Sequence, residues 1–368
     1  MMNQMIIANL VHRPFRTIIS VVAVAVEVTL ILLIVGIMLG ILNDSSSRQV
    51  GIGADIMVQP PGSSLIMGVS GAPVSVKVAG KLSQLPHVSA VAPVVMQVTT
   101  AGTVEVLYGI DLQSFDEVSG GFHYLSGGPF QGPYDMIIDD LKAGAKHLKV
   151  GDTLETLNHP FRICGIVEHG KGAREFVPIA TLQDLIGAIG KATIFYVKLD
   201  NPNNADEVVA AIKNIPGLQQ YGVHSLKEYL SLMTSASIPG LTTVIDVVIG
   251  ISAVIGFIVI FQAMYAAVME RTREIGILKS LGAGKLYIVN VVLRETLLIA
   301  VGGVILGIII SYCARTGLRT KFQTLPVLIT YGWLVKATII ALVGSLLGAF
   351  YPAMKAAQKD PIDALAYE

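Results

Sequence analysis

The chain has 368 residues, of which 53% are hydrophobic and 14% are charged, and its formal net charge at pH 7 is zero. This apolar content is too high for a soluble protein of this length, and the neutral formal charge offers no sign of nucleic-acid binding. The apolar residues gather near the two ends, while the middle half has an ordinary globular composition. The sequence therefore predicts a membrane protein with a folded domain outside the lipid.

Four apolar runs are long enough to be transmembrane helices. Each is close to the ~20 residues that a helix needs to cross the ~30 Å hydrocarbon core of a bilayer. The first run is too long for a signal-peptide core and no small-residue cleavage site follows it, so we expect a retained anchor. The runs lie at residues 17–42, 240–269, 288–313 and 332–352.

Basic residues beside these runs set the expected orientation. They occur in residues 1–16, between the second and third runs, and in the tail 353–368. Because cytoplasmic flanks carry an excess of Lys and Arg, we place both termini in the cytoplasm and residues 43–237 outside. The loop 314–331 opposes this orientation, since it would face outward with Arg315, Arg319 and Lys321. The flanks assigned to the cytoplasm still carry more Lys and Arg residues than this loop, so the orientation is kept.

Glu27 lies about ten residues into the first run, roughly 15 Å along the helix. An ionised carboxylate at this depth is costly, so we expect it to face a cavity, a dimer axis or a hydrogen-bonding group such as Gln262. Three interpretations stay open. Glu27 is a satisfied protonated carboxyl, or it lines a substrate path with Gln262, or it ligates a metal-bearing amphipathic substrate such as haem.

Small-residue steps of the G-x-x-x-G type let transmembrane backbones approach closely. Gly36 and Gly40 form such a step in the first run, and we assign it to a dimer interface. The equivalent steps that start at Gly303 and Gly344 are expected to pack within one chain.

The middle segment reads as an α+β domain. Strand, helix and strand signals at 50–110 and 191–237 resemble two halves of a split β-α-β domain. Residues 111–190 form an insertion that contains a hairpin and a helix capped by Thr181, so we expect two subdomains. The loop after Pro60 carries Leu65, Ile66 and Met67, which either contact lipid, a substrate or a second copy, or pack back on the domain.

Catalytic and metal chemistry is weakly indicated. Cys164 falls in the middle domain and Cys313 in the third run, so a disulfide is not expected. His159, Glu168 and His169 lie near Cys164 on a predicted hairpin, but alternation places them on different faces. We therefore expect no catalytic residues and no metal site.

The segment 270–285, called the coupling segment below, lies between the second and third runs. Its apolar residues Ile275, Leu278 and Leu281 recur at helical spacing, which predicts an amphipathic helix. It is either a docking surface for another protein or an ordinary basic juxtamembrane loop. Gly282 and Gly284 are expected to end the helix. Charged residues cover its other faces, namely Glu270, Arg271, Arg273, Glu274 and Lys279.

Together these features resemble the MacB/FtsX-type permease subunits of ABC transporters, also called type VII. The resemblance covers essentially the whole chain. In the middle domain, AGAKHLKVGDTLETLNHPFRICGIVE (143–168) followed by FVPIATLQDLIG (176–187) is similar to the periplasmic core domain of those permeases. The other matching parts are ERTREIGILKSLGA (270–283), the Arg294-Glu295 pair with the glycines 302–307, and YPAMKAAQKDPIDAL (351–365).

The resemblance implies a homodimeric permease in the bacterial inner membrane. It would bind two copies of an ABC ATPase through the coupling segment, and nucleotide-driven closure would move the outer domains by mechanotransmission. The implied substrate is amphipathic or hydrophobic: haem, a drug, a peptide or a lipid-linked molecule. A periplasmic adaptor is a further partner in the family, although this outer domain is short for it.

No Walker A loop is evident. The nearest string, Gly284-Lys285-Leu286, lacks the first glycine and the hydroxyl residue, so ATP and Mg are expected to bind a partner subunit. An FtsX-like signalling unit that activates an outer enzyme and moves no substrate is the alternative function. A membrane-anchored scaffold is a third, which the coupling segment argues against.

Overall fold

The computed structural model describes residues 14–63, 71–99, 105–234, 237–238 and 240–359. The apolar residues Leu65, Ile66 and Met67 and the end of the tail lie outside the described residues. The chain divides into two compact units. The helical unit comprises residues 1–40, 240–320 and 327–368, and the sheet unit comprises 41–239 and 321–326.

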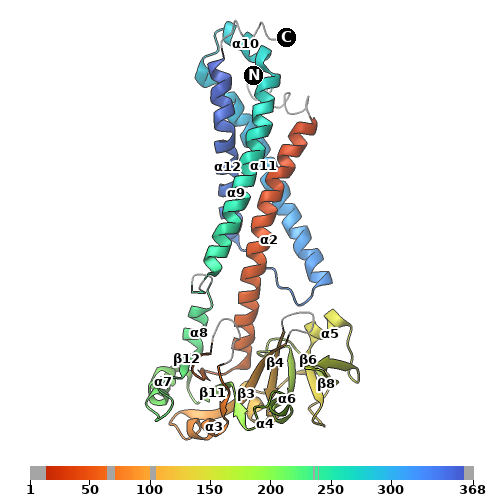
Figure 1. The fold of residues 1–368 in the computed structure, drawn as a ribbon, viewed down its shortest axis with the longest axis vertical. Helices are drawn as coiled ribbons and strands as arrows, with labels where there is room; N and C mark the ends of the chain where they lie inside the picture. Colours follow the sequence, from red (N-terminus) through yellow and green to blue (C-terminus); the bar gives the residue numbers. More distant parts are fainter. Residues whose placement is uncertain (1–13, 64–70, 100–104, 235–236, 239, 360–368) are drawn as a thin grey trace. The chain divides into compact units, whose positions relative to one another are not determined.

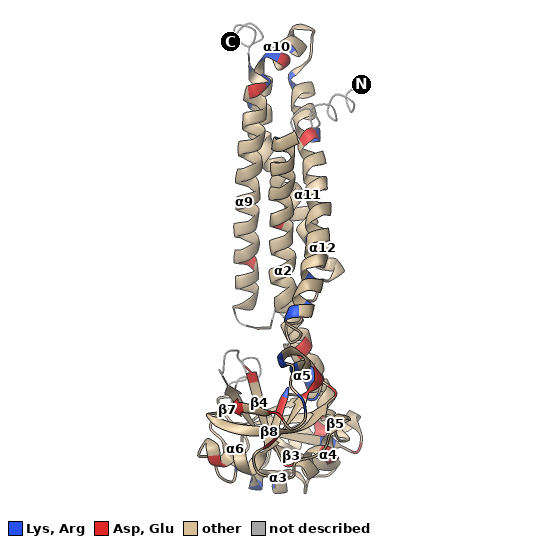
Figure 2. Ribbon diagram, turned by 90° about the vertical axis from the view of Figure 1, so that its right-hand side faces the viewer, with Lys and Arg blue, Asp and Glu red and all other residues tan. Residues whose placement is uncertain are grey.

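Within the described residues, four helices are long and apolar enough to cross a membrane, which confirms the one-plus-three arrangement. They are α2 (Pro14–Ile52), α9 (Leu241–Glu270), α11 (Lys285–Lys321) and α12 (Tyr331–Gln358). α2 and α11 extend well beyond the predicted runs, because hydropathy marks only the lipid-crossing part of a helix. Charged residues are sparse along the middle of these helices and gather near α10 (Thr272–Ser280) (Figure 2).

Glycines allow the long helices to pack closely. A Cβ atom at Gly303 of α11 would lie 2.8 Å from Val24 Cγ1 of α2, and one at Gly307 would lie 2.7 Å from the Ala25 carbonyl oxygen. In α12, a Cβ atom at Gly348 would lie 2.8 Å from the Phe257 carbonyl oxygen of α9. These steps pack within the chain, as the sequence indicates.

The sheet unit contains one mixed ten-stranded sheet with the order β12-β1-β11-β3-β4-β9-β6-β8-β5, and β7 pairs with β8. β2 (Val74–Ser75) and β10 (Lys191–Ala192) form a separate pair. The sheet strands are β1 (Ile56–Gln59), β3 (Val88–Thr99), β4 (Glu105–Ile110), β5 (Tyr124–Gly127), β6 (Asp135–Asp139), β7 (Thr153–Thr156), β8 (His159–Val167), β9 (Glu175–Pro178), β11 (Ile194–Leu199) and β12 (Gly222–Ser225).

Both faces of this sheet are covered, because its strands alternate between two cores. In β11, Tyr196 joins a cluster with Phe115 and Ile52, whereas Phe195 and Val197 join a cluster with the helices on the other face. The helices of the sheet unit are α3 (Lys77–Leu82), α4 (Leu112–Ser119), α5 (Asp140–Lys146), α6 (Ile179–Leu185), α7 (Ala205–Lys213) and α8 (Leu226–Leu232), with the short 3-10 turn η1 (Pro202–Asn204).

The inserted residues 111–190 do not form a separate subdomain, which corrects the sequence expectation. β4 of the first half pairs in parallel with β9 of the insertion, with Leu107 opposite Glu175. The sheet therefore continues from one part into the other, and Tyr108, Phe176 and Tyr196 share one core.

Thr181 is not a helix cap, which is a second correction. α6 begins at Ile179 directly after β9, with Pro178 at the N-cap position. Thr181 lies inside the helix and its hydroxyl donates to the Pro133 carbonyl oxygen at 2.5 Å.

Candidate functional site

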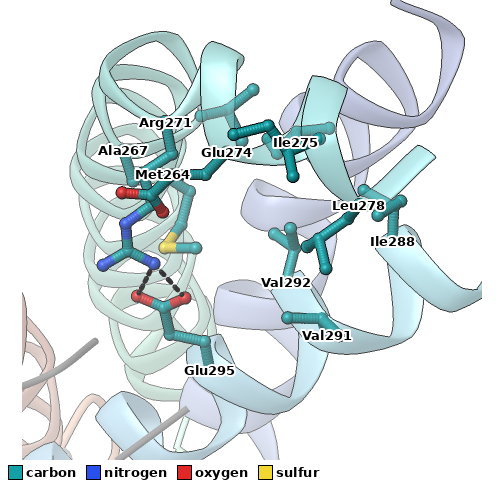
Figure 3. Close-up of a pocket in the computed structure, with 12 residues that line it drawn as sticks. Met264, Ala267, Arg271, Glu274, Ile275, Leu278, Ile288, Val291, Val292 and Glu295 are labelled. Atoms are coloured by element: carbon teal, nitrogen blue, oxygen red, sulfur yellow. Dashed lines mark hydrogen bonds and ion pairs between the residues drawn. The ribbon is translucent and has the colours of Figure 1, made fainter. Parts of the chain in front are cut away.

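A mainly apolar pocket of about 290 Å³ lies in the helical unit and is lined by α9, α10 and α11 (Figure 3). Met264, Ile275 and Val292 contribute one side chain from each of these helices. Three charged residues, Arg271, Glu274 and Glu295, complete the lining. The coupling segment therefore forms one wall of the pocket.

A buried ion-pair cluster holds this end of the unit together. The Glu295 side chain on α11 is buried, and Arg271 Nη1 donates to its two carboxylate oxygens at 3.0 and 3.3 Å. Arg16 of α2 also donates to Glu295 at 3.1 Å, and it lies 3.7 Å from Glu270. A buried carboxylate is stable only when it is paired in this way. Glu295 thus joins α2, the α9–α10 junction and α11.

The neighbouring residue Arg294 takes no part in the cluster. Its side chain is exposed and donates to Asn290 one turn earlier at 3.1 Å. Of the Arg294-Glu295 pair noted in the sequence, Glu295 is the residue that joins helices.

Ile275 and Leu278 on α10 face the long helices of the same chain and line the pocket between them, and their assignment to ATPase coupling stays a prediction. Ile275 is buried in the core of the helical unit and Leu278 packs against that core. Periodicity reveals an apolar face but does not tell whether the same chain or a partner covers it. The structure leaves Ile277, Leu281 and Leu286 exposed, the last two by 80% and 85%.

Ile277 and Leu286 were missed because they lie outside the helical repeat. Ile277 lies at the edge of the pocket and is partly open to solvent, and Leu286 follows just beyond the end of the coupling segment. Leu281 is the C-cap residue of α10, after which Gly282 adopts φ 96°, so the chain turns here as the sequence predicts.

The charged residues of the coupling segment divide into two groups. Glu270, Arg273 and Glu274 are exposed. Arg271 belongs to the buried ion-pair cluster, and Lys279 donates to the Ala357 carbonyl oxygen at 3.0 Å and to the Lys359 carbonyl oxygen. Lys279 therefore ties the coupling segment to the end of α12.

Glu27 is only 3% exposed and lies inside the helical unit. A Cβ atom at Gly256 of α9 would overlap its carboxylate, and one at Gly344 of α12 would lie 4.0 Å from Oε1. Neither carboxylate oxygen has a hydrogen-bond partner among the described residues. Gln262 is exposed elsewhere on α9, so the structure does not bring the two residues of the expected substrate path together.

Gly36 and Gly40 are both buried within the chain. The Gly36 carbonyl oxygen accepts from the Leu328 amide at 2.8 Å, and a Cβ atom at Gly36 would lie 3.3 Å from Val327 Cγ1. The small size of Gly36 thus serves an intrachain contact. Its assignment to a dimer interface stays a prediction.

Cys164 and Cys313 are free. Burial, with a smaller contribution from the nearby Asp135, raises the pKa of the Cys164 thiol to about 11. Within the residues that the structure describes, no group of three or more His, Cys, Asp or Glu side chains could hold a metal ion.

Comparisons with known proteins place both parts of the chain. Residues 17–215 match the model of the MacB-like periplasmic core domain, and residues 247–361 match that of the FtsX-like permease C-terminal domain. The uncharacterized ABC transporter permease YknZ of Bacillus subtilis is 28% identical over 232 residues, which cover 60% of this chain and 57% of YknZ.

The macrolide export ATP-binding/permease protein MacB of a Shewanella species is 27% identical over 326 residues, 80% of this chain and 49% of MacB. The chain thus spans about half the length of these relatives. Among solved structures, the periplasmic region of MacB from Actinobacillus actinomycetemcomitans aligns with a TM-score of 0.37 at 20% identity, over 48% of this chain and 91% of that structure.

Proposed function

Because the chain belongs to the MacB/FtsX family of ABC transporter permeases, we propose that it is the permease subunit of an efflux or extraction transporter driven by a separate ATPase. The multi-pass helices place it in a membrane, which we take to be the bacterial inner membrane with both termini cytoplasmic. Two copies of the permease would work with two copies of the ATPase.

The exposed apolar residues of the coupling segment carry this proposal. Leu281 at the end of α10 and Leu286 in the first turn of α11, just beyond the coupling segment, are almost fully exposed. Burying one such side chain contributes about 1.5–3 kcal/mol, so a partner that covers them gains affinity. Ile275, the Arg271–Glu295 pair and Lys279 fix the same segment to the long helices. Force applied by an ATPase at Leu281 would therefore reach α9, α11 and α12.

The test replaces Leu281 by Asp and measures how much ATPase co-purifies with the detergent-solubilised permease. We expect the loss of a buried apolar contact and the added charge to weaken binding by about tenfold or more. Ile189→Asp in the sheet unit is the matched control, because Ile189 is similarly exposed. Unchanged co-purification with Leu281→Asp would show that the ATPase docks elsewhere.

Ile275→Asp serves as a second comparison. Because Ile275 is buried in the permease itself, this change should destabilise the helical unit and should not act on docking alone.

The proposed substrate is amphipathic or hydrophobic, with haem as one member of that class. Glu27 supports this class, because it supplies a buried carboxyl group at the depth of the lipid. Gln262 is exposed elsewhere on α9 and does not lie beside it. A Soret band in the purified wild-type protein after haem addition, lost in Glu27→Gln, would support haem. ATP hydrolysis without movement of any substrate would favour the alternative, an FtsX-like unit that activates an outer enzyme.

A further inference from the structure

The chain passes between the helical unit and the sheet unit four times, and the passage within α2 differs in kind from that between α8 and α9. α2 is one continuous helix of 39 residues, Pro14–Ile52, whose first part belongs to the helical unit and whose last part, from Ile41, belongs to the sheet unit. The chain returns to the helical unit between two separate helices. α8 ends at Leu232, Met233 has φ −82° and ψ 43°, and α9 begins only after Gly240, which is left-handed with φ 82°.

A continuous helix transmits displacement along its axis because every turn is hydrogen-bonded to the next. α8 and α9 are separate helices and do not share one such axis of hydrogen bonds. α2 is therefore a continuous helix that can carry force into the sheet unit.

Ion pairs fix the last part of α2 to the sheet. Arg174, which precedes β9, donates through Nη2 to Asp44 of α2 at 3.2 Å and through Nη1 to Asp139 at 2.9 Å. Asp139 ends β6, is fully buried and caps α5 through the Lys142 amide at 2.7 Å. Arg48 of α2 lies 3.1 Å from Asp44. One guanidinium thus bridges a helix carboxylate and a sheet carboxylate.

A second layer of hydrogen bonds lies one turn further along α2. Gln49 Nε2 donates to the Tyr108 hydroxyl at 3.2 Å, and the Tyr196 hydroxyl donates to Gln49 Oε1 at 3.0 Å. Both tyrosines are buried, on β4 and β11, and their hydroxyls are 3.0 Å apart. Arg48 also donates to the Gly172 carbonyl oxygen at 3.2 Å and its own carbonyl accepts from the Gly172 amide at 2.9 Å.

These hydrogen bonds fix the position of α2 on the sheet more strictly than apolar packing alone would. Side chains in an apolar contact can slide past one another, whereas charge-assisted hydrogen bonds with paired geometry fix both position and rotation. The contacts reach β4, β6 and β11, which are separate strands of one sheet. A displacement of α2 is therefore applied to the sheet as a whole.

We propose that Asp44, Arg48 and Gln49, with their partners Arg174, Tyr108 and Tyr196, form a force-bearing anchor, called the α2 anchor, through which nucleotide-driven movement of α2 reaches the sheet unit. Arg174 is its central positioning residue. The inference rests on the proposed function, since it requires an ATPase that moves the helices.

Hydrogen exchange of the intact permease–ATPase complex tests the anchor. Exchange is measured with and without ATP and orthovanadate, at residues 272–280 and at β4 and β9. In the wild type we expect nucleotide to change exchange at both places. In Arg174→Gln the response of β4 and β9 should fall about fivefold or more, while residues 272–280 respond as before.

Arg162→Gln is the matched control. Arg162 pairs with Asp135 through two hydrogen bonds of 3.0 and 3.2 Å in the same sheet, and among the described residues neither of them forms a hydrogen bond with α2. This variant should respond like the wild type. A full response of β4 and β9 in Arg174→Gln, or none in the wild type while residues 272–280 respond, would overturn the anchor.

The two proposals fail in different ways. If residues 272–280 of the wild type do not respond to nucleotide, the proposed function fails. If Arg174→Gln unfolds the sheet unit, as fast exchange without nucleotide would reveal, Asp44→Asn decides the question, because it keeps the Arg174–Asp139 pair and weakens the bonds of Asp44 to Arg174 and to Arg48. A full strand response in Asp44→Asn would then overturn the anchor.

Discussion

Adjacent residues in α11 show how strongly position decides the role of a charge. Glu295 is 2% exposed and accepts from two guanidinium groups, whereas Arg294 is exposed and bonds only within its own helix. The sequence presents them as a pair. The difference depends on which side of α11 meets Arg16 and Arg271, and these come from distant parts of the chain.

We predict that Glu295→Gln lowers the free energy of unfolding by about 3–5 kcal/mol, because it leaves the guanidiniums of Arg16 and Arg271 beside a neutral group. Arg294→Gln, the control, should change it by less than ~0.5 kcal/mol. Chemical denaturation of the detergent-solubilised permease measures both. Similar small effects of the two changes would show that the cluster contributes little to stability.

At Glu27, burial without a hydrogen-bond partner among the described residues makes the carboxylate costly for stability alone. If it serves transport, Glu27→Gln should leave assembly intact and reduce substrate-stimulated ATP hydrolysis, tested first with haem, and Glu27→Leu should reduce it at least as much. Wild-type stimulation in both variants would leave Glu27 a tolerated buried group. Misassembly in both would make it a packing residue against Gly256 and Gly344.

Among the elements, the contact between α11 and α2 depends on which glycine faces α2. A Cβ atom at Gly303 would lie 2.9 Å from the Val21 carbonyl oxygen, whereas one at Gly302 would have only Val21 Cγ2 nearby, at 3.8 Å. Alanine gains about 1 kcal/mol over glycine in a helix, and overpacking costs about 1–3 kcal/mol.

We therefore predict that Gly302→Ala raises the thermal unfolding temperature of the permease and that Gly303→Ala lowers it. The two variants are matched controls for each other, because they make the same change at neighbouring positions. A higher unfolding temperature for both variants would mean that α2 shifts readily to make room for the added methyl group at this contact.

Local patterns predict most single elements, and β1 at Ile56–Gln59 matches the expected strand. They do not predict pairing between distant strands. The residue patterns around Leu107 and Glu175 do not indicate that β4 and β9 lie side by side. The sequence therefore predicts two subdomains where the structure has one continuous sheet. Likewise, the repeat of Ile275 and Leu278 predicts the helix α10 but not the partner of its apolar face.

At the scale of the whole molecule, orientation in the membrane is open to a direct test. Ser47, Asn203 and Ser280 are exposed positions, so single cysteines there should be accessible wherever the solvent reaches them. In intact cells, an impermeant maleimide should label Ser47→Cys and Asn203→Cys but not Ser280→Cys. The reverse pattern would invert the topology and remove the ATPase from the coupling segment.

The native cysteines affect this experiment differently. Cys313 is exposed and is replaced by Ser in the labelling background. Because burial raises the pKa of Cys164 to about 11, only a very small fraction is thiolate near pH 7, and maleimide should react with it slowly. The background protein without introduced cysteines is therefore the control for residual labelling.

The unbroken course of α2 also sets the angular phase between its two ends. Each residue of an α-helix advances the chain by ~1.5 Å and turns it by ~100°. One residue inserted after Gly40 would therefore turn the part of α2 that carries Asp44, Arg48 and Gln49 by ~100° about the helix axis relative to the part before Gly40, whereas seven residues would return it to within ~20°. The helix can thus be lengthened with this phase nearly kept only by close to whole numbers of turns, such as about seven or about eleven residues.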